Sequence, residues 1–145
     1  WLPPLPAGLT RGLSAVGGLQ PGDASRFVNA WPSPSAVAIC YEISDGRALA
    51  KATAQGAEWL LTIANLDPYP QLLQRQFLAL AQLRAIETGR DVLSVANTGP
   101  TALVSADGTV QRLLKPRTDA VAAAELQRRQ QLTGYSRLVW AWSSR

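Results

Sequence analysis

The apolar run from Ala36 to Ile39 constrains the fold more than any other stretch, because it ends at the only cysteine of the chain, Cys40. Small and β-branched residues that follow a break rich in proline and serine predict a buried β-strand over Ala36–Cys40. A turn-forming Ser-Asp-Gly sequence at 44–46 and a helical pattern come next, so the backbone has to turn directly after the cysteine. The stretch therefore predicts a strand-to-helix corner with a thiol at its tip.

The residues at this corner have both functional and structural interpretations. A thiol there projects at the sheet edge, where backbone N–H groups of the next helix stabilise an anion, so Cys40 is a candidate nucleophile. Free cysteines are also among the most buried residues, and filling space in the core is the alternative. Glu42 either supports the thiol or caps the next helix. Tyr41 either supports the reacting group or packs as an ordinary aromatic.

Composition excludes several classes of protein. The chain has 145 residues, 47% hydrophobic and 17% charged, which indicates one globular domain. The net charge of +4 comes from scattered basic residues, so we expect no nucleic-acid partner. There is no histidine and one cysteine, which excludes a Cys–His pair, an internal disulfide and a histidine-based metal site. We therefore expect no metal and no cofactor. No apolar run approaches the roughly 20 residues that span a bilayer.

The rest of the chain predicts strands alternating with helices. Residues 1–35 hold six of the ten prolines and predict a long irregular segment, with a short helix near 9–16 and a brief edge strand at 26–28. The regular elements expected after it are strand Ala36–Cys40, helix Arg47–Gln55 capped by Ser44 or Asp45 with Gly56 behind it, strand Glu58–Ile63, helix Gln71–Thr88 ended by Gly89, strand Asp91–Ala96, and a hairpin of Ala102–Ser105 and Thr109–Leu113 around Asp107-Gly108. Residues 118–128 fit either a helix or a strand. This order predicts an α/β fold with helices layered on a sheet.

Side chains on these elements give further candidates. Asn65 and Asn97 directly follow two of the predicted strands, so we expect them at the same sheet edge, where they either line a binding pocket or act as turn residues. Arg84 and Glu87 are three residues apart on the long helix and predict a structural ion pair. The apolar face of that helix is predicted to consist of Leu73, Phe77, Leu80 and Leu83.

Several segments, in a fixed order over residues 27–137, give the chain a resemblance to a known family. They are Val37–Glu42, Gly56–Asn65, Leu83–Arg90, Ala96–Gly99, Ala102–Gly108 and Thr133–Arg137. Together they resemble the carbon–nitrogen hydrolases of the nitrilase superfamily. The Ile-Cys-Tyr-Glu sequence at 39–42 favours the N-acyltransferase branch, whose members acylate apolipoproteins, over soluble amidases.

The resemblance implies part of a four-layer α-β-β-α sandwich and a Glu-Lys-Cys triad, in which Cys40 matches the nucleophile. In the family the Glu is the general base and the Lys steadies the oxyanion, and both precede the Cys. Here no Glu precedes Glu42 and no Lys precedes Lys51. The resemblance further implies transfer of a fatty acyl chain from a phospholipid donor to the N-terminal diacylglyceryl-cysteine of an apolipoprotein acceptor, through a cysteine thioester, on the periplasmic face of a bacterial inner membrane.

We expect the chain to be the C-terminal half of such a domain, with an irregular segment at 1–35, an α/β core at 36–137 and a tail at 138–145 leading toward a membrane helix. The first half of the domain and the membrane helices would then lie elsewhere, and this chain alone is expected to be inactive and poorly stable. Two alternatives stay open. One is a soluble nitrilase-type amidase acting on small amides, and the other is an inactive remnant that keeps the sheet without the chemistry.

Overall fold

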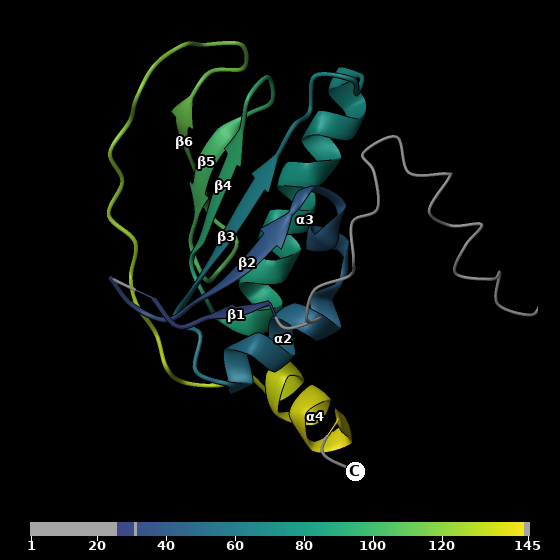
Figure 1. Cartoon of the computed structure of the whole chain (residues 1–145), viewed down its shortest axis with the longest axis vertical. Helices are drawn as coiled ribbons and strands as arrows, with labels where there is room; N and C mark the ends of the chain where they lie inside the picture. Colours follow the sequence, from purple (N-terminus) through teal and green to yellow (C-terminus); the bar gives the residue numbers. More distant parts are fainter. Residues whose placement is uncertain (1–25, 31, 144–145) are drawn as a thin grey trace, which may run out of the picture.

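The computed structural model describes residues 26–30 and 32–143, which form one six-stranded mixed sheet (Figure 1). The strands are β1 (Phe27–Val28), β2 (Ser35–Ile39), β3 (Trp59–Ala64), β4 (Val92–Ala96), β5 (Thr101–Val104) and β6 (Val110–Leu114), and they lie side by side in that order. Strands β2, β3 and β4 are parallel, whereas β1, β5 and β6 run antiparallel to their neighbours. The predicted α/β class, the edge strand and the hairpin are confirmed. The helix predicted at 9–16 lies outside the described residues.

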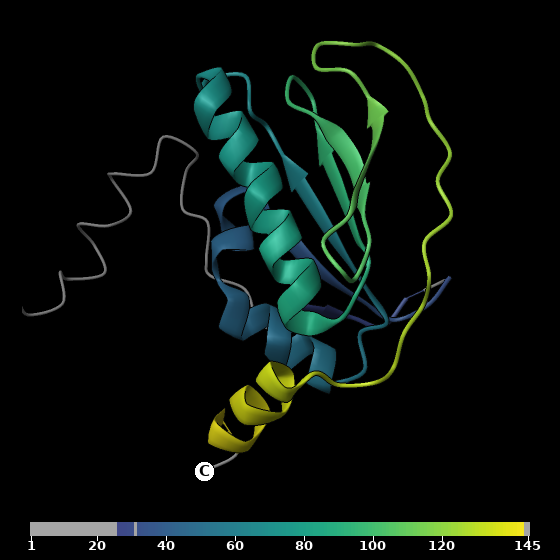
Figure 2. The same cartoon turned by 180° about the vertical axis from the view of Figure 1, so that it is seen from behind.

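The helices are η1 (Cys40–Ser44, a 3-10 helix), α2 (Gly46–Ala54), α3 (Gln71–Thr88) and α4 (Gly134–Ser143). Figures 1 and 2 show α3 lying along one face of the sheet, with α2 and α4 packed together near one end of it. The signals that predicted α2 and α3 are confirmed, whereas α4 was not predicted and includes residues that were expected in the tail. The Asp45 carboxylate accepts a 3.0 Å hydrogen bond from the Ala48 N–H and so caps α2, and Gly89 ends α3 in a left-handed conformation with φ of 64°.

The core lies between the sheet and these helices. Side chains alternate between the two faces of a strand, so every second strand residue points toward α2 and α3. The buried apolar residues there come from four strands and three helices: Ala36, Ala38, Leu60, Val92, Ala102 and Val104 meet Ile43, Leu49, Ala52, Leu78, Ala81 and Ala85. Many of them are alanines, which lets the helices approach the sheet closely.

The prediction for the buried face of α3 is partly wrong. Phe77 and Leu80 pack against the core, but Leu73 and Leu83 are 37% and 44% exposed. The core instead receives neighbouring positions of the helix, and two of them, Gln74 and Arg84, are polar and only 6% exposed. The apolar period therefore predicted the position of the helix in the sequence correctly, but it predicted the wrong residues for the buried face.

These buried polar side chains of α3 have partners, which is why the core tolerates them. The Gln74 amide donates to the carbonyls of Leu66 and Tyr69 at 3.1 and 2.9 Å. The Arg84 guanidinium pairs with Glu87 at 3.1 Å, which confirms that predicted ion pair. Gln74 thus joins the loop after β3 to the first turns of α3.

Residues 118–128 form neither the helix nor the strand that their sequence allowed, and they belong to a longer segment, 115–133, without helix or strand. They run back along the sheet and are held at its lower end in the view of Figure 1. The Gln127 N–H donates to the Asp91 carboxylate at 2.8 Å, and the Arg129 N–H donates to the Glu58 carbonyl at 3.1 Å. Long-range bonds to Asp91 and Glu58 hold this segment, and no local pattern could predict them.

Arg90 links this segment to the sheet through hydrogen bonds of its buried side chain. Its side chain is 1% exposed, and it donates to the Ala57 carbonyl at 2.8 Å and to the Gln131 carbonyl at 2.7 Å. Burial lowers the pKa of Arg90 from its ordinary value, and the Glu58 carboxylate acts in the opposite direction. An arginine nevertheless stays protonated in proteins, so the site holds a buried cation.

Replacing Arg90 by glutamine is expected to lower the free energy of unfolding by about 2–4 kcal/mol, because the shorter neutral side chain leaves buried carbonyls without a donor. Chemical denaturation of a protein that contains this chain, followed by tryptophan fluorescence, measures the loss. Arg137→Gln removes the same charge from an exposed position of α4 and is expected to change little. Equal losses in both variants would show that the buried hydrogen bonds of Arg90 contribute nothing.

The opposite face of the sheet is apolar, and none of the helices that the structure describes covers it. Ile39 and Ile63 are 62% and 46% exposed there, and Val37, Leu61 and Val95 are half-buried. The described residues thus form a sheet with helices on one face, which corresponds to two adjacent layers of an α-β-β-α sandwich.

Candidate active site

The backbone at Cys40 has the geometry of a sharp corner. Strand β2 ends at Ile39, one residue earlier than predicted, and Cys40 begins η1 with φ of 54°. A non-glycine residue in this left-handed region is uncommon and costs on the order of 1 kcal/mol. Such strain tends to occur at functional sites, where the surrounding structure holds it. The predicted corner is confirmed, and the thiol stands at it half-buried.

The Glu42 carboxylate holds this corner with both of its oxygens. Its Oε2 accepts a 2.8 Å hydrogen bond from the Ile39 N–H, and its Oε1 forms an ion pair with the Arg26 guanidinium. The first contact spans Cys40 and is the capping interaction that the sequence allowed, although it caps η1 and not α2. Glu42 therefore ties the residue before the thiol to the turn after it.

Arg26 is a site residue that sequence analysis missed. It lies directly before β1, and its carbonyl accepts a 2.8 Å hydrogen bond from the Val37 N–H, so the β1–β2 pairing carries it to Glu42. The Arg26 and Glu42 side chains are 20% and 36% exposed, so water screens this pair less than it screens a pair on the open surface. No local signal links the two residues, because an antiparallel strand pair brings them together.

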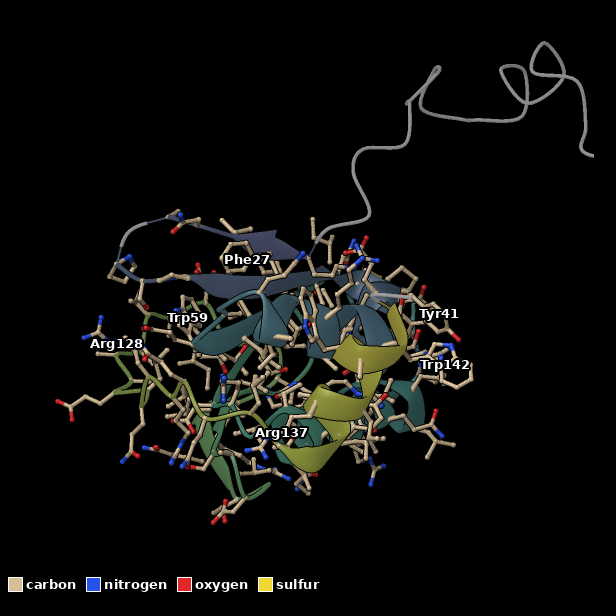
Figure 3. All side chains as sticks on the ribbon, turned by 90° about the horizontal axis from the view of Figure 1, so that it is seen from below. Phe27, Tyr41, Trp59, Arg128, Arg137 and Trp142 are labelled. Atoms are coloured by element: carbon tan, nitrogen blue, oxygen red, sulfur yellow. The ribbon has the colours of Figure 1, made fainter. Side chains whose placement is uncertain are left out.

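Ile43 and Tyr41 face opposite directions on the short helix. Ile43 is 1% exposed and anchors η1 in the core. Tyr41 is 73% exposed and extends from the periphery of the molecule (Figure 3). Tyr41 is thus not part of the core that the described residues form, and its support of the reacting group stays a prediction.

Asn65 and Asn97 lie together at the same sheet edge as Cys40. Each directly follows a parallel strand, as Cys40 does, and the Asn97 amide donates to the Asn65 side-chain oxygen at 2.8 Å. Their oxygens also accept turn hydrogen bonds: Asn97 from the Leu66 N–H at 2.9 Å, and Asn65 from the Asp67 N–H at 3.1 Å. The expected juxtaposition is confirmed, and the turn role is visible. Their contact with a substrate stays a prediction.

Two further observations on the described residues concern metal binding and membrane crossing. No group of three or more histidine, cysteine, aspartate or glutamate side chains suited to a metal ion occurs among them. None of the helices in this part of the chain has both the length and the apolar character needed to cross a bilayer. The described residues place one thiol at a corner where the backbone is strained, and a carboxylate accepts a hydrogen bond from the residue before it. This arrangement suits nucleophilic catalysis.

Comparisons with known proteins show which family the chain resembles. A relative in Parasynechococcus marenigrum, named apolipoprotein N-acyltransferase, is 97% identical over 145 residues, which are 100% of this chain and 31% of that protein. A relative of the same name in Prochlorococcus marinus is 66% identical over 138 residues, covering 94% of this chain and 28% of that protein. The chain thus spans about a third of the length of these relatives.

A solved structure and a family model complete the comparison. A mutant of the Nesterenkonia AN1 amidase from the nitrilase superfamily matches 68% of this chain and 39% of that chain with 19% identity and a TM-score of 0.49. The family model described as carbon-nitrogen hydrolase matches residues 10–133, most of the chain and all of the corner at Cys40. The chain belongs to the carbon–nitrogen hydrolase family.

Proposed function

We propose that this chain supplies the nucleophile of an enzyme that moves a fatty acyl chain from a phospholipid to the N-terminal diacylglyceryl-cysteine of an apolipoprotein. The observation that carries the proposal is the Cys40 corner, where a thiol is held in a left-handed conformation and braced by Glu42. The names of the relatives in Parasynechococcus and Prochlorococcus, apolipoprotein N-acyltransferase, support the acceptor and the type of transfer.

The first half-reaction forms a thioester on Cys40. The thiolate attacks the ester carbonyl of the phospholipid, the bond from that carbon to the glycerol oxygen breaks, and the lysophospholipid leaves with a proton. The thiolate is the nucleophilic form of a cysteine, so a base has to take the thiol proton as the bond forms. We assign that base, and a cation for the oxyanion, to the part of the full-length relatives that this chain does not span.

The second half-reaction regenerates the thiol. The α-amino group of the acceptor attacks the thioester carbonyl, an amide bond forms, and the carbon–sulfur bond breaks. Hydrogen-bond donors aimed at the developing oxyanion contribute roughly 3–4 kcal/mol to such a step. The Tyr41 N–H is the donor that we assign from this chain, because it directly follows the nucleophile in the backbone.

The proposal includes partners and a location. The acyl donor is a membrane phospholipid and the acceptor is an apolipoprotein, so we place the full-length protein in the bacterial inner membrane with this domain on the periplasmic face. Within it, the chain forms the C-terminal half of the hydrolase domain, and the second sheet of the sandwich covers the open apolar face at Ile39 and Ile63. By itself the chain is expected to be inactive.

The test uses a full-length protein in which this chain replaces the matched part of the Parasynechococcus relative, called the test protein below. Purified in detergent, it is expected to transfer a labelled acyl chain from a phospholipid to a synthetic diacylglyceryl-cysteine peptide. The same preparation is expected to show no release of ammonia from small aliphatic amides. Ammonia release without acyl transfer would replace the proposal by the amidase alternative, and inactivity in both assays would favour an inactive remnant.

A further inference from the structure

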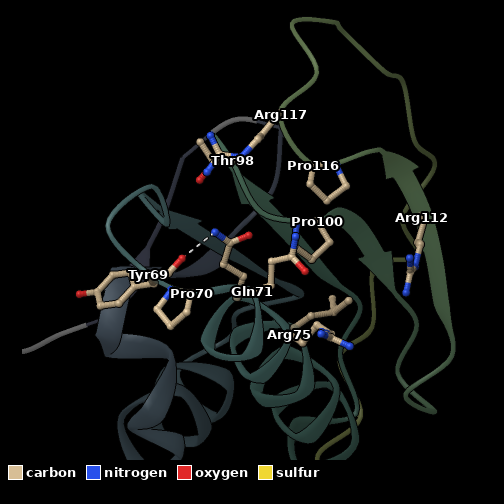
Figure 4. A pocket seen from close by; sticks show the side chains of 11 residues that line it. Tyr69, Pro70, Gln71, Arg75, Thr98, Pro100, Arg112, Pro116 and Arg117 are labelled. Carbon is tan, nitrogen blue, oxygen red and sulfur yellow. Dashed lines mark hydrogen bonds between the residues drawn. The ribbon is translucent and has the colours of Figure 1, made fainter.

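A second candidate site lies on the helix side of the sheet, at the same edge as Cys40 but lined by other residues. It is a pocket of about 610 Å³ between the first turns of α3, the loop after β4, strand β6 and the segment that follows β6 (Figure 4). Tyr69 and Gln74 line it on one side, and Thr98 lines it on another. Neither the predicted site residues nor the proposed acyl transfer uses this pocket.

Three arginines surround the pocket from different elements. Arg75 comes from α3, Arg112 from β6, and Arg117 from the segment behind β6, so the three arginines stand on separate walls of the pocket (Figure 4). None of the described residues that line the pocket is acidic. The pocket is thus lined by three positive charges and, among the described residues, by no negative one.

The charges of these arginines are poorly compensated within the described part of the chain. Arg117 pairs with Asp67 at 3.6 Å, but both side chains are more than half exposed, so the pair is weak. Arg75 and Arg112 have no ion-pair partner among the described residues. Like-charged side chains around one hollow repel each other, and a bound anion relieves that repulsion.

The position of Arg112 shows which face of the sheet the pocket occupies. Arg112 pairs with Ala102, whose side chain is buried in the core beneath the helices, so Arg112 stands on the helix side. A second sheet of an α-β-β-α sandwich covers the opposite face, where Ile39 and Ile63 are exposed. The pocket therefore lies on the side of the sheet that faces away from the second sheet.

We propose that this pocket binds a phosphate ester through Arg75, Arg112 and Arg117. Guanidinium groups form paired, charge-assisted hydrogen bonds with the tetrahedral oxygens of phosphate, and three of them match a phosphate better than a single carboxylate. The pocket lies at the edge where β3 and β4 end, which is also the edge of Cys40. The ligand is the headgroup phosphate of a phospholipid or a soluble phosphate, which share this chemistry.

Equilibrium dialysis of the test protein against radiolabelled inorganic phosphate, at constant ionic strength and without phosphate in the detergent, tests the site. The double variant Arg75→Gln/Arg112→Gln is expected to bind at least tenfold more weakly than the unmodified protein. The matched control is Arg128→Gln/Arg137→Gln, which removes the same charge from exposed positions outside the pocket and is expected to bind within twofold of the unmodified protein. Melting temperatures confirm that both variants are folded.

Two results would overturn the site. One is equal binding by the pocket variant and the unmodified protein, and the other is an equal loss in the pocket variant and the control, which would reduce the effect to net charge.

Dialysis against a short-chain phosphatidylglycerol below its micelle concentration then identifies whether the bound phosphate belongs to a lipid or to a soluble molecule. Tighter binding than inorganic phosphate, lost in the pocket variant, indicates a lipid headgroup, and equal affinity indicates a soluble phosphate. Because no arm measures acyl transfer, failure here leaves the proposed function standing.

Discussion

Replacing Cys40 by alanine in the test protein is expected to lower the rate of acyl transfer at least about a thousandfold, since the covalent route loses its nucleophile. Cys40→Ser is expected to lose nearly as much, because a hydroxyl is a far weaker nucleophile than a thiol at neutral pH. The chain offers no second thiol that could take over, as Cys40 is its only cysteine. Steady-state transfer of a labelled acyl chain to the peptide acceptor measures both losses.

The same variants also test whether Cys40 only fills space. The side chain is half-buried, and alanine keeps the left-handed backbone at similar cost, so melting temperatures are expected to stay close to that of the unmodified protein. A Cys40→Ala protein that transfers acyl chains at the normal rate would end the assignment of the nucleophile. A large fall in melting temperature together with activity would support the space-filling role.

Glu42→Gln is expected to lower the rate of acyl transfer about a hundredfold, with less effect on the Michaelis constant for the phospholipid. Glutamine can still accept a hydrogen bond from the Ile39 N–H, but it leaves the Arg26 guanidinium without its counter-ion. The corner then loses one of the two contacts of Glu42 that hold the backbone around Cys40, and misplacing a catalytic group by about 1 Å can cost roughly 10²-fold in rate. Arg26→Gln is expected to give a smaller loss in the same parameter.

Glu125→Gln is the matched control for Glu42, because it makes the same chemical change at an exposed position in the segment before α4. It is expected to keep the normal rate. Arg26→Lys, which keeps the charge, is expected to recover part of the rate lost in Arg26→Gln. If Glu42→Gln were as active as the Glu125 control, the hydrogen bond and ion pair of Glu42 would have no role in catalysis.

The sequence predicted most of the secondary structure because local signals determine it. Helix α3 begins after Pro70 and ends at Gly89, and both residues act through their own backbone conformations. The three parallel strands follow apolar runs of β-branched and small residues, and Gly108 marks the hairpin with φ of 87°. Each of these signals lies within a few residues of the feature it predicts.

The errors concern features that tertiary contacts decide. Gln74 and Arg84 are buried on α3, where Gln74 donates to the Leu66 carbonyl and Arg84 pairs with Glu87, whereas hydrophobicity alone had favoured the exposed Leu83. Residues 118–128 lack regular structure because they are held by bonds to distant parts of the sheet. A pattern along the sequence contains no information about such partners.

For the candidate site, too, local signals predicted some residues and missed one that a tertiary contact brings in. Asn65 and Asn97 were expected at one sheet edge because each follows a predicted strand. Cys40 was expected at a strand-to-helix corner, and since the carboxyl ends of parallel strands meet at one edge, it lies at the edge of Asn65 and Asn97. Of the two residues whose ion pair holds the corner, the sequence predicted only one. Glu42 stood out beside the thiol, but its partner Arg26 comes from the neighbouring strand pair and carries no motif.

The acyl-enzyme itself gives the most direct test. The test protein is incubated with a phospholipid donor and no acceptor, digested, and analysed by mass spectrometry of the peptide that contains Cys40. We expect a fatty acyl mass on the Cys40 sulfur that hydroxylamine removes, and that disappears when the diacylglyceryl-cysteine peptide is added. Acyl transfer that proceeds with no acyl mass on that peptide at any time, or with the mass on another residue, would contradict catalysis through the Cys40 thioester.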